Sequence, residues 1–199
     1  LKASGIEVIG IDISSSSVDF ALKNGATDYA FSRKTPGLEN KIFEITGGRG
    51  ADAVIIAAAT SSLDPVNFAG AVSRKKGKVV VLGAVPTGFD RDPHWYRKEL
   101  ELKMACSYGP GRYDFSYEEK GVDYPYAYVR WTEKRNMEAF QHLIAKGSIN
   151  LDYLTTHEFE FQNAKDAYEL ILQRKESFAG IALRYDSAKT HSFTPIVTH

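Results

Sequence analysis

The chain has 199 residues, of which 43% are hydrophobic, and its 25 basic and 25 acidic residues give a formal net charge of zero. That length can bury a substantial core, so one globular domain is the starting expectation. The balanced charge excludes a general nucleic-acid binder and leaves no excess charge for an anionic membrane surface. We therefore expect neither nucleic acid nor membrane among the partners.

The cysteine content indicates the cellular compartment and limits the metal sites that the chain can form. Cys106 is the single cysteine, so the sequence has no disulfide framework, and five scattered histidines cannot complete a cysteine-rich zinc site. No apolar run approaches the roughly 18 to 20 residues of a membrane helix, and no secretory leader opens the chain. These features predict a cytoplasmic protein without a metal site in this chain.

The first residues have the pattern of a helix end. Leu1 is not an initiator methionine, and Gly5 follows residues 1–4 as a helix terminator. We therefore expect the chain to be part of a longer polypeptide whose upstream part carries further chemistry.

Apolar runs and turn residues alternate along the chain with the periods of strands and helices. The expected strands cover residues 8–12, 26–31, 53–59, 79–83, 100–107, 159–161 and 179–185. The expected helices lie between residues 14 and 25, 37 and 47, and 60 and 77, and over 135–146 and 164–172. This alternation predicts an α/β fold with a mainly parallel sheet.

Three of these segments carry more specific expectations. The apolar run Ala53–Ala59 is typical of a strand that is covered on both faces. The helix after Thr60 should end in the basic turn Arg74–Gly77, because cations suit a helix C-terminus. Cys106, inside the strand 100–107, is expected to be a small buried side chain.

Asp12 follows the first apolar run directly and is the most informative single residue. In a dinucleotide-binding fold, an acid at the end of the second strand binds the adenosine ribose hydroxyls and repels a 2′-phosphate. No arginine follows Asp12, so a site here would prefer NAD over NADP. For this residue taken alone, a solvated aspartate or a helix cap is the alternative.

Small residues at two other strand ends favour a flat cofactor lying across the sheet. They are Ala57–Ala59 and Leu82–Ala84, and ligands of open α/β sheets bind at the carboxyl ends of strands. The alternative is that small residues only end strands tightly. The glycine-rich phosphate loop, expected about twenty residues before the acid, would precede Leu1. Gly109–Gly111 does not replace it, because Pro110 removes an amide donor and no third glycine opens a helix.

Five segments taken together resemble the medium-chain, zinc-type alcohol dehydrogenase superfamily. They are Val8-Ile9-Gly10-Ile11-Asp12, Asn24-Gly25-Ala26-Thr27-Asp28, Gly50-Ala51-Asp52-Ala53-Val54, Gly77-Lys78-Val79-Val80-Val81-Leu82-Gly83 and Leu154-Thr155-Thr156-His157. Residues 107–114 narrow the likeness to bacterial two-part oxidoreductases, in which a zinc-type dehydrogenase half precedes a sugar-oxidoreductase-like half. The resemblance covers most of the chain. It implies a Rossmann-type, doubly wound α/β domain that lacks its first strand and glycine loop.

The resemblance also implies a domain plan and a site. Residues 1–133 would form the truncated nucleotide-binding domain, 134–185 would complete it and pack on a missing catalytic domain, and 186–199 would be a linker or flexible tail. The cofactor would be NAD, bound by Asp12, Ile13, Ser17, Ala58, Leu82, Gly83, Ala84 and Ser107. Zinc, where the full-length protein binds it, and the catalytic residues would lie outside this chain.

The implied function is hydride transfer between nicotinamide and an alcohol or sugar carbon, in an NAD-dependent dehydrogenase. We expect a homodimer, paired through the strand around residues 104–107, and an inactive isolated chain. One alternative is a non-catalytic assembly or regulatory module of the same fold; another is a zinc-free enone or quinone reductase. The aromatic stretch between Tyr108 and Trp131 forms either the wall of a sugar pocket or a packing loop.

Overall fold

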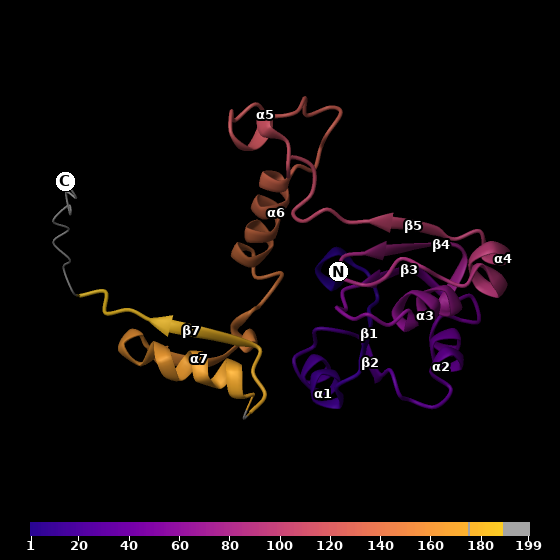
Figure 1. Ribbon diagram of the computed structural model, residues 1–199, viewed down its shortest axis with the longest axis horizontal. Coiled ribbons are helices and arrows are strands. Elements are labelled where there is room, and N and C mark those ends of the chain that lie inside the picture. The colour runs from indigo at the N-terminus through magenta and orange to yellow at the C-terminus, as the bar shows by residue number, and fades with distance from the viewer. Residues whose placement is uncertain (175, 189–199) are drawn as a thin grey trace. The chain divides into compact units, whose positions relative to one another are not determined.

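The protein forms two compact units in the computed structural model, which describes residues 1–174 and 176–188. Unit 1 is Leu1–Ala145, and unit 2 begins at Lys146 (Figure 1). Each sheet is parallel, so the expected α/β fold with parallel sheets is confirmed. Residues 189–199 of the expected linker lie outside the described residues.

The first sheet of unit 1 holds two strands joined by one helix. A 3-10 turn, Lys2–Ser4, precedes β1 (Ile9–Asp12), and α1 (Ser15–Lys23) leads to β2 (Tyr29–Ser32). The two strands pair in parallel from Ile9↔Tyr29 to Asp12↔Ser32. Ser14 begins α1 because its hydroxyl accepts the Ser17 N–H at 3.3 Å.

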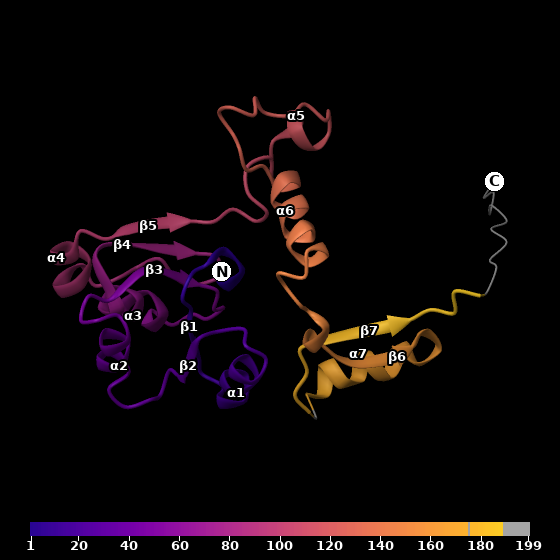
Figure 2. The ribbon, with the colours of Figure 1, turned by 180° about the vertical axis from the view of Figure 1, so that it is seen from behind.

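The second sheet of unit 1 has the order β3-β4-β5. Its strands are β3 (Ala51–Ile56), β4 (Ser73–Val81) and β5 (Glu101–Met104). The helices α2 (Leu38–Ile45) and α3 (Asp64–Val72) lie before and after β3 in the chain. A π-type turn, Arg91–Trp95, and the short α4 (Tyr96–Lys98) precede β5. Figure 2 shows α2 and α3 on the same side of this sheet.

Two buried clusters hold the helices on the strands. The first is formed by Leu38, Ile42, Phe68 and Val72, against which Ile9, Ile11, Phe31 and Val54 pack. The second is formed by Ile56, Val66, Ala69, Val79, Val81 and Trp95. The first cluster touches strands of both sheets, so β1, β2 and β3 share one layer of helices.

The run Ala53–Ala59 was wrongly expected to be covered on both faces. Val54 and Ile56 pack into the core clusters, whereas Ala53 is exposed and the Ile55 side chain is 45% exposed. The helices α2 and α3 pack on only one face of this sheet. The other face of β3 therefore remains open within the described residues.

The expected basic end of α3 is also wrong. Arg74–Gly77 lies in β4, and the cation at the C-terminus of α3 is Lys98 from α4. Its ammonium donates to the carbonyl oxygens of Gly70, Ala71 and Ser73 at 3.0, 2.6 and 2.8 Å. Burial lowers the pKa of Lys98. Lys98, which is distant in sequence, therefore makes the contact with the C-terminus of α3 that was expected of Arg74–Gly77.

The rest of unit 1 consists of α5 (Phe115–Glu118) and α6 (Glu133–Ala145), the second of which falls across the expected boundary at residue 133. In unit 2, α7 (Ala164–Gln173) connects the parallel strands β6 (Thr155–Glu160) and β7 (Gly180–Arg184) and buries Ala167 and Leu170. Among residues 1–174 and 176–188, no helix combines the length and apolarity needed to cross a membrane.

Candidate cofactor site

Asp12 ends β1 and is exposed. Its backbone carbonyl accepts the Arg33 N–H at 2.8 Å, which fixes the residue on the ladder with β2. Its Oδ1 atom accepts the Ser14 N–H at 2.8 Å. No described residue donates to Oδ2. The carboxylate is thus oriented by one hydrogen bond and keeps a free oxygen that can accept a ligand hydroxyl.

The turn after Asp12 presents two more of the expected residues. Ile13 is 76% exposed, and Ser17 is exposed in the first turn of α1. Ser14 caps α1 and also donates its amide to Asp12, so it positions the candidate ribose ligand. The sequence signal for this role is the spacing Asp-x-Ser at a strand-to-helix turn, which is typical of an Asx turn.

The backbone segments that follow β3 and β4 come close together at Gly83, and we call this approach the crossing. The Leu82 and Gly83 amides both donate to the Ile56 carbonyl, at 2.9 and 2.8 Å, and the Thr60 amide donates to the Ala84 carbonyl at 2.9 Å. A Cβ atom on Gly83 would lie 2.1 Å from the Ala58 carbonyl oxygen. Glycine is therefore required here by the close approach of another backbone.

This crossing brings four of the expected residues together. Ala58 and Ala84 are exposed beside Gly83, and the Leu82 side chain is 56% exposed. They offer a small, partly apolar surface where two parallel strands end, which is the usual place of a ligand in an α/β sheet. Thr60 was not among the expected site residues. Its amide holds one side of this surface by the hydrogen bond to Ala84.

Ser107 follows β5 in a left-handed turn with φ 43 and is exposed. The Ala105 amide donates to the Val81 carbonyl at 2.9 Å, so the chain leaves β5 beside the end of β4. Cys106 is exposed and lies beyond β5, which corrects the expectation of a buried residue inside a strand. The strand is shorter than expected, so this side chain escapes burial.

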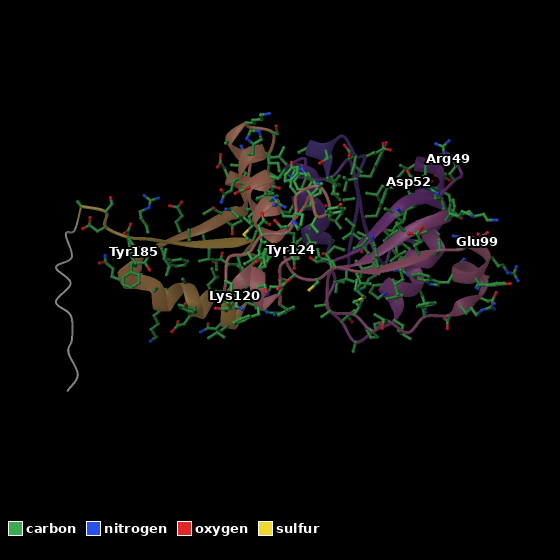
Figure 3. The ribbon with its side chains drawn as sticks, turned by 90° about the horizontal axis from the view of Figure 1, so that it is seen from above. Arg49, Asp52, Glu99, Lys120, Tyr124 and Tyr185 are labelled. Atoms are coloured by element: carbon green, nitrogen blue, oxygen red, sulfur yellow. The ribbon has the colours of Figure 1, made fainter. Side chains whose placement is uncertain are left out.

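The aromatic stretch after Ser107 is tied together around Asp114. This carboxylate accepts the Ser116 amide at 2.9 Å and the Tyr124 hydroxyl at 2.5 Å. The bond lowers the pKa of Asp114 and raises the pKa of Tyr124 to about 12. The Tyr124 ring also stacks on Tyr117 with ring centroids 5.4 Å apart. Figure 3 labels Tyr124 and Lys120 in this loop.

The outer surface of the same loop keeps its aromatic rings accessible. Tyr128 is 88% exposed, and the Arg130 guanidinium lies 4.8 Å from the Tyr126 ring centroid and 4.1 Å from that of Trp131. These contacts are internal to the loop. They leave open the choice between a sugar-pocket wall and a packing loop.

The expected site residues thus fall into two groups. Asp12, Ile13 and Ser17 follow β1, while Ala58, Leu82, Gly83 and Ala84 gather where β3 and β4 end, with Ser107 after the adjacent β5. No hydrogen-bonded ladder connects the two sheets within the described residues. The structure therefore brings the second group together and leaves the first group on a separate sheet.

One hollow of unit 1 lies apart from the expected cofactor residues. A shallow hollow of about 290 Å³ lies between α3 and the turn before α4, and its lining includes Arg33, Asp64 and Trp95 but none of the expected cofactor residues. Arg33 and Asp64 of this lining form an ion pair at 2.7 Å. In the part of the chain that the structure describes, no three His, Cys, Asp or Glu residues could hold a metal ion together.

Solved structures with the same fold include alcohol dehydrogenases. A zinc-dependent alcohol dehydrogenase 2 from Streptococcus pneumonia aligns with a TM-score of 0.65 and 17% identity over 92% of this chain and 46% of its own. An Escherichia coli alcohol dehydrogenase complexed with NADH aligns with a TM-score of 0.62 and 19% identity, over 89% of this chain and 44% of its own.

Sequence comparison gives the family. A curated relative, the probable D-xylulose reductase A of Emericella nidulans, is 29% identical over 174 residues, which are 84% of this chain and 41% of the relative. The chain thus spans less than half the length of these relatives. Residues 1–119 match the family model of the zinc-binding dehydrogenases, and the match includes both groups of expected site residues. The chain therefore belongs to the zinc-binding dehydrogenase family.

Proposed function

We propose that this chain is the NAD(H)-binding part of a dehydrogenase that acts on an alcohol, a polyol or a sugar. The observation that carries the proposal is Asp12, an exposed acid at the end of a parallel strand with one carboxylate oxygen free. Family membership and the dehydrogenases of the same fold support it. The proposed substrate class is taken from what the relatives act on.

The described residues fit the adenosine end of the cofactor better than its pyrophosphate. Asp12 provides the acceptor that a ribose diol needs, and the crossing at Gly83 provides a surface with little side-chain bulk. No glycine-rich loop at a helix N-terminus, which would bind the pyrophosphate, is found among residues 1–174 and 176–188. The adenosine end therefore fits, and the residues that would hold the phosphates are not among those described.

Each group would act on a different part of the dinucleotide. Asp12 would accept hydrogen bonds from the adenosine ribose hydroxyls and repel a 2′-phosphate, with Ile13 and Ser17 on the adenine side. Ala58, Leu82, Gly83 and Ala84 would flank the cofactor, and Ser107 would lie near the nicotinamide. The bound nicotinamide supplies the hydride acceptor or donor, and these residues fix its position relative to a substrate carbon.

The test is a titration of the full-length protein with NADH and with NADPH, followed by cofactor fluorescence. We expect NADH to bind more tightly than NADPH. The variant Asp12→Asn should lose about 10- to 100-fold in NADH affinity, since a hydrogen bond to a charged group contributes about 1.5 to 3 kcal/mol, and should narrow the preference for NADH. Asp19→Asn is the matched control, because Asp19 is an exposed acid on the adjacent helix.

Three outcomes would count against the proposal. If millimolar NADH leaves the fluorescence unchanged, the chain is better described as a non-catalytic module of the same fold. If Asp12→Asn and Asp19→Asn behave alike, Asp12 is not a cofactor ligand. A preference for NADPH would favour the zinc-free reductase alternative.

We also propose that the full-length protein is a cytoplasmic homodimer. Among the described residues, strand β5 pairs only with β4 and is an edge strand of its sheet, and Met104 at its end is 62% exposed. A free edge of this kind can pair with its own copy across a two-fold axis. The single exposed Cys106 is compatible with a reducing cytoplasm. Sedimentation of the full-length protein tests the dimer.

A further inference from the structure

The segment between Tyr108 and Asn136, which we call the aromatic loop, is closed at its base by two hydrogen bonds. The Asn136 Nδ2 atom donates to the Tyr108 carbonyl at 2.8 Å, and the Glu133 amide donates to the Pro110 carbonyl at 2.9 Å. The far end of the loop therefore returns to the residues that directly follow Ser107.

Three arginines lie in the aromatic loop, and carboxylates neutralise two of them. Arg112 forms an ion pair with Glu118, and Arg135 forms one with a second acid of the loop, Asp123. Arg130 differs from both. Within residues 1–174 and 176–188, no carboxylate forms an ion pair with its guanidinium and no group accepts a hydrogen bond from it. The N–H donors of Arg130 are therefore available to a ligand.

Two aromatic rings hold this unpaired guanidinium. The Arg130 Cζ atom lies 4.1 Å from the ring centroid of Trp131 and 4.8 Å from that of Tyr126. A ring contacts the face of a guanidinium and does not use its N–H groups, which lie in the guanidinium plane. Arg130 thus keeps its donors in a fork, and such a fork matches two oxygens of one carboxylate or phosphate.

The surroundings of Arg130 fit a sugar that carries an anionic group. Tyr126 and Trp131 are exposed, and so is Tyr128 nearby in the chain. Exposed rings with hydroxyl groups offer both a flat apolar surface and hydrogen bonds, which a sugar ring needs. The loop contains as many acidic as basic residues, so it has no excess charge for a polyanion. One held arginine in a neutral loop fits a small ligand with one anionic group.

We propose that Arg130, together with the rings of Tyr126 and Trp131, binds the anionic group of an acidic sugar through two oxygens of a carboxylate or a phosphate. This inference rests on the proposed function, because it names the class of sugar that the dehydrogenase would accept. The aromatic loop begins directly after Ser107, which is the residue proposed to lie near the nicotinamide. Arg130 would select a charged sugar over a neutral one and would take no part in hydride transfer.

The test is a calorimetric titration of the full-length protein, without cofactor, with D-glucuronate, D-glucose 6-phosphate and neutral D-glucose. One of the two charged sugars should bind about 10- to 100-fold more tightly than glucose, since this is the contribution of a hydrogen bond to a charged group. The sugar that binds more tightly identifies the anion as a carboxylate or a phosphate. Acetate and inorganic phosphate alone should bind more weakly than that sugar, because they cannot use the rings.

Three variants locate the charged contact. Arg130→Gln should lose about 10- to 100-fold in affinity for the charged sugar and leave glucose binding unchanged. Arg130→Lys should recover only part of this loss, because lysine keeps the charge without the planar fork. Lys120→Gln is the matched control, since it removes another exposed cation that lies over a ring of the same loop, and it should retain the affinity. Arg130 is exposed, so its replacement should leave the circular dichroism spectrum unchanged.

Three results would overturn the proposal. Neither charged sugar binds more tightly than glucose, the bare anions bind as tightly as the charged sugars, or Arg130→Gln and Lys120→Gln lose affinity equally. The NADH titration is a separate readout. If the protein binds NADH and gives one of these three results, the Arg130 site alone is refuted. If the protein prefers a charged sugar through Arg130 and does not bind NADH, the site stands and the proposed function is refuted.

Discussion

Replacing Gly83 by alanine tests the crossing that gathers half of the candidate site. The added Cβ would lie 2.1 Å from the Ala58 carbonyl oxygen and 2.7 Å from the Ala57 carbonyl carbon. Both are backbone atoms, so no side chain can move aside, and one of the two segments must shift. A shift would weaken the hydrogen bonds from Gly83 to Ile56 and from Thr60 to Ala84.

The magnitude follows from these contacts. Overpacking costs about 1 to 3 kcal/mol, and each weakened hydrogen bond adds about 0.5 to 1.5 kcal/mol. Alanine also restricts the unfolded chain, which returns about 0.4 to 1 kcal/mol. With two hydrogen bonds weakened, we therefore expect Gly83→Ala to lower the free energy of unfolding by about 1 to 5 kcal/mol.

Urea unfolding followed by the fluorescence of the buried Trp95 measures this difference. Gly88→Ala is the matched control, because a Cβ there would meet only the Leu63 Cδ2 atom at 3.5 Å. The control should stay within about 1 kcal/mol of the unchanged protein. Equal unfolding free energies for the two variants would refute the close approach of the two backbones at Gly83.

Two further predictions concern side chains outside the site. Lys98→Met keeps the aliphatic stem but removes the donor to three carbonyls at the end of α3. It should destabilise unit 1 by about 1 to 3 kcal/mol in the same urea assay. The control Lys34→Met, at an exposed lysine, should leave the free energy of unfolding unchanged. In an alkaline titration followed by tyrosinate absorbance, Tyr124 should ionise last, near its pKa of about 12, and Asp114→Asn should return it toward about 10. Because the folded pKa is raised, the stabilisation from this bond is complete below about pH 10 and is lost as the pH rises toward 12. The pKa of Asp114 is lowered, so the same stabilisation is also lost in acid, as the pH falls through that lowered value. If the unchanged protein and Asp114→Asn give identical titrations, the hydrogen bond from Tyr124 to Asp114 is refuted.

The sequence predicted those elements whose signals are local. The helix expected between residues 14 and 25 is α1, and the apolar run over residues 79–83 predicted a strand that forms the end of β4. Strand pairing in parallel followed from the alternation of strands and helices. These features depend on neighbours within a few residues, so a single sequence is enough to find them.

The errors arose where distant residues decide. Ile55 belongs to an apolar run, yet its exposure depends on what covers the sheet, which the run itself does not encode. The C-terminus of α3 is bound by Lys98, which lies well after the basic turn that the local pattern favoured. For the site, Asp12 was found from its place after a strand, but the part played by Thr60 depends on the crossing of two strand ends.

The two groups of the candidate site follow strands of two separate sheets in unit 1. A dinucleotide that reaches from Asp12 to Gly83 needs β1 and β3 held in a fixed relation, and the shared contact with α2 and α3 is the link between them in the described residues. A dinucleotide that binds both groups therefore carries the entropic cost of fixing this relation. The weak point of this chain as a cofactor site is therefore the relation between its two sheets, while each group of residues is well held within its own.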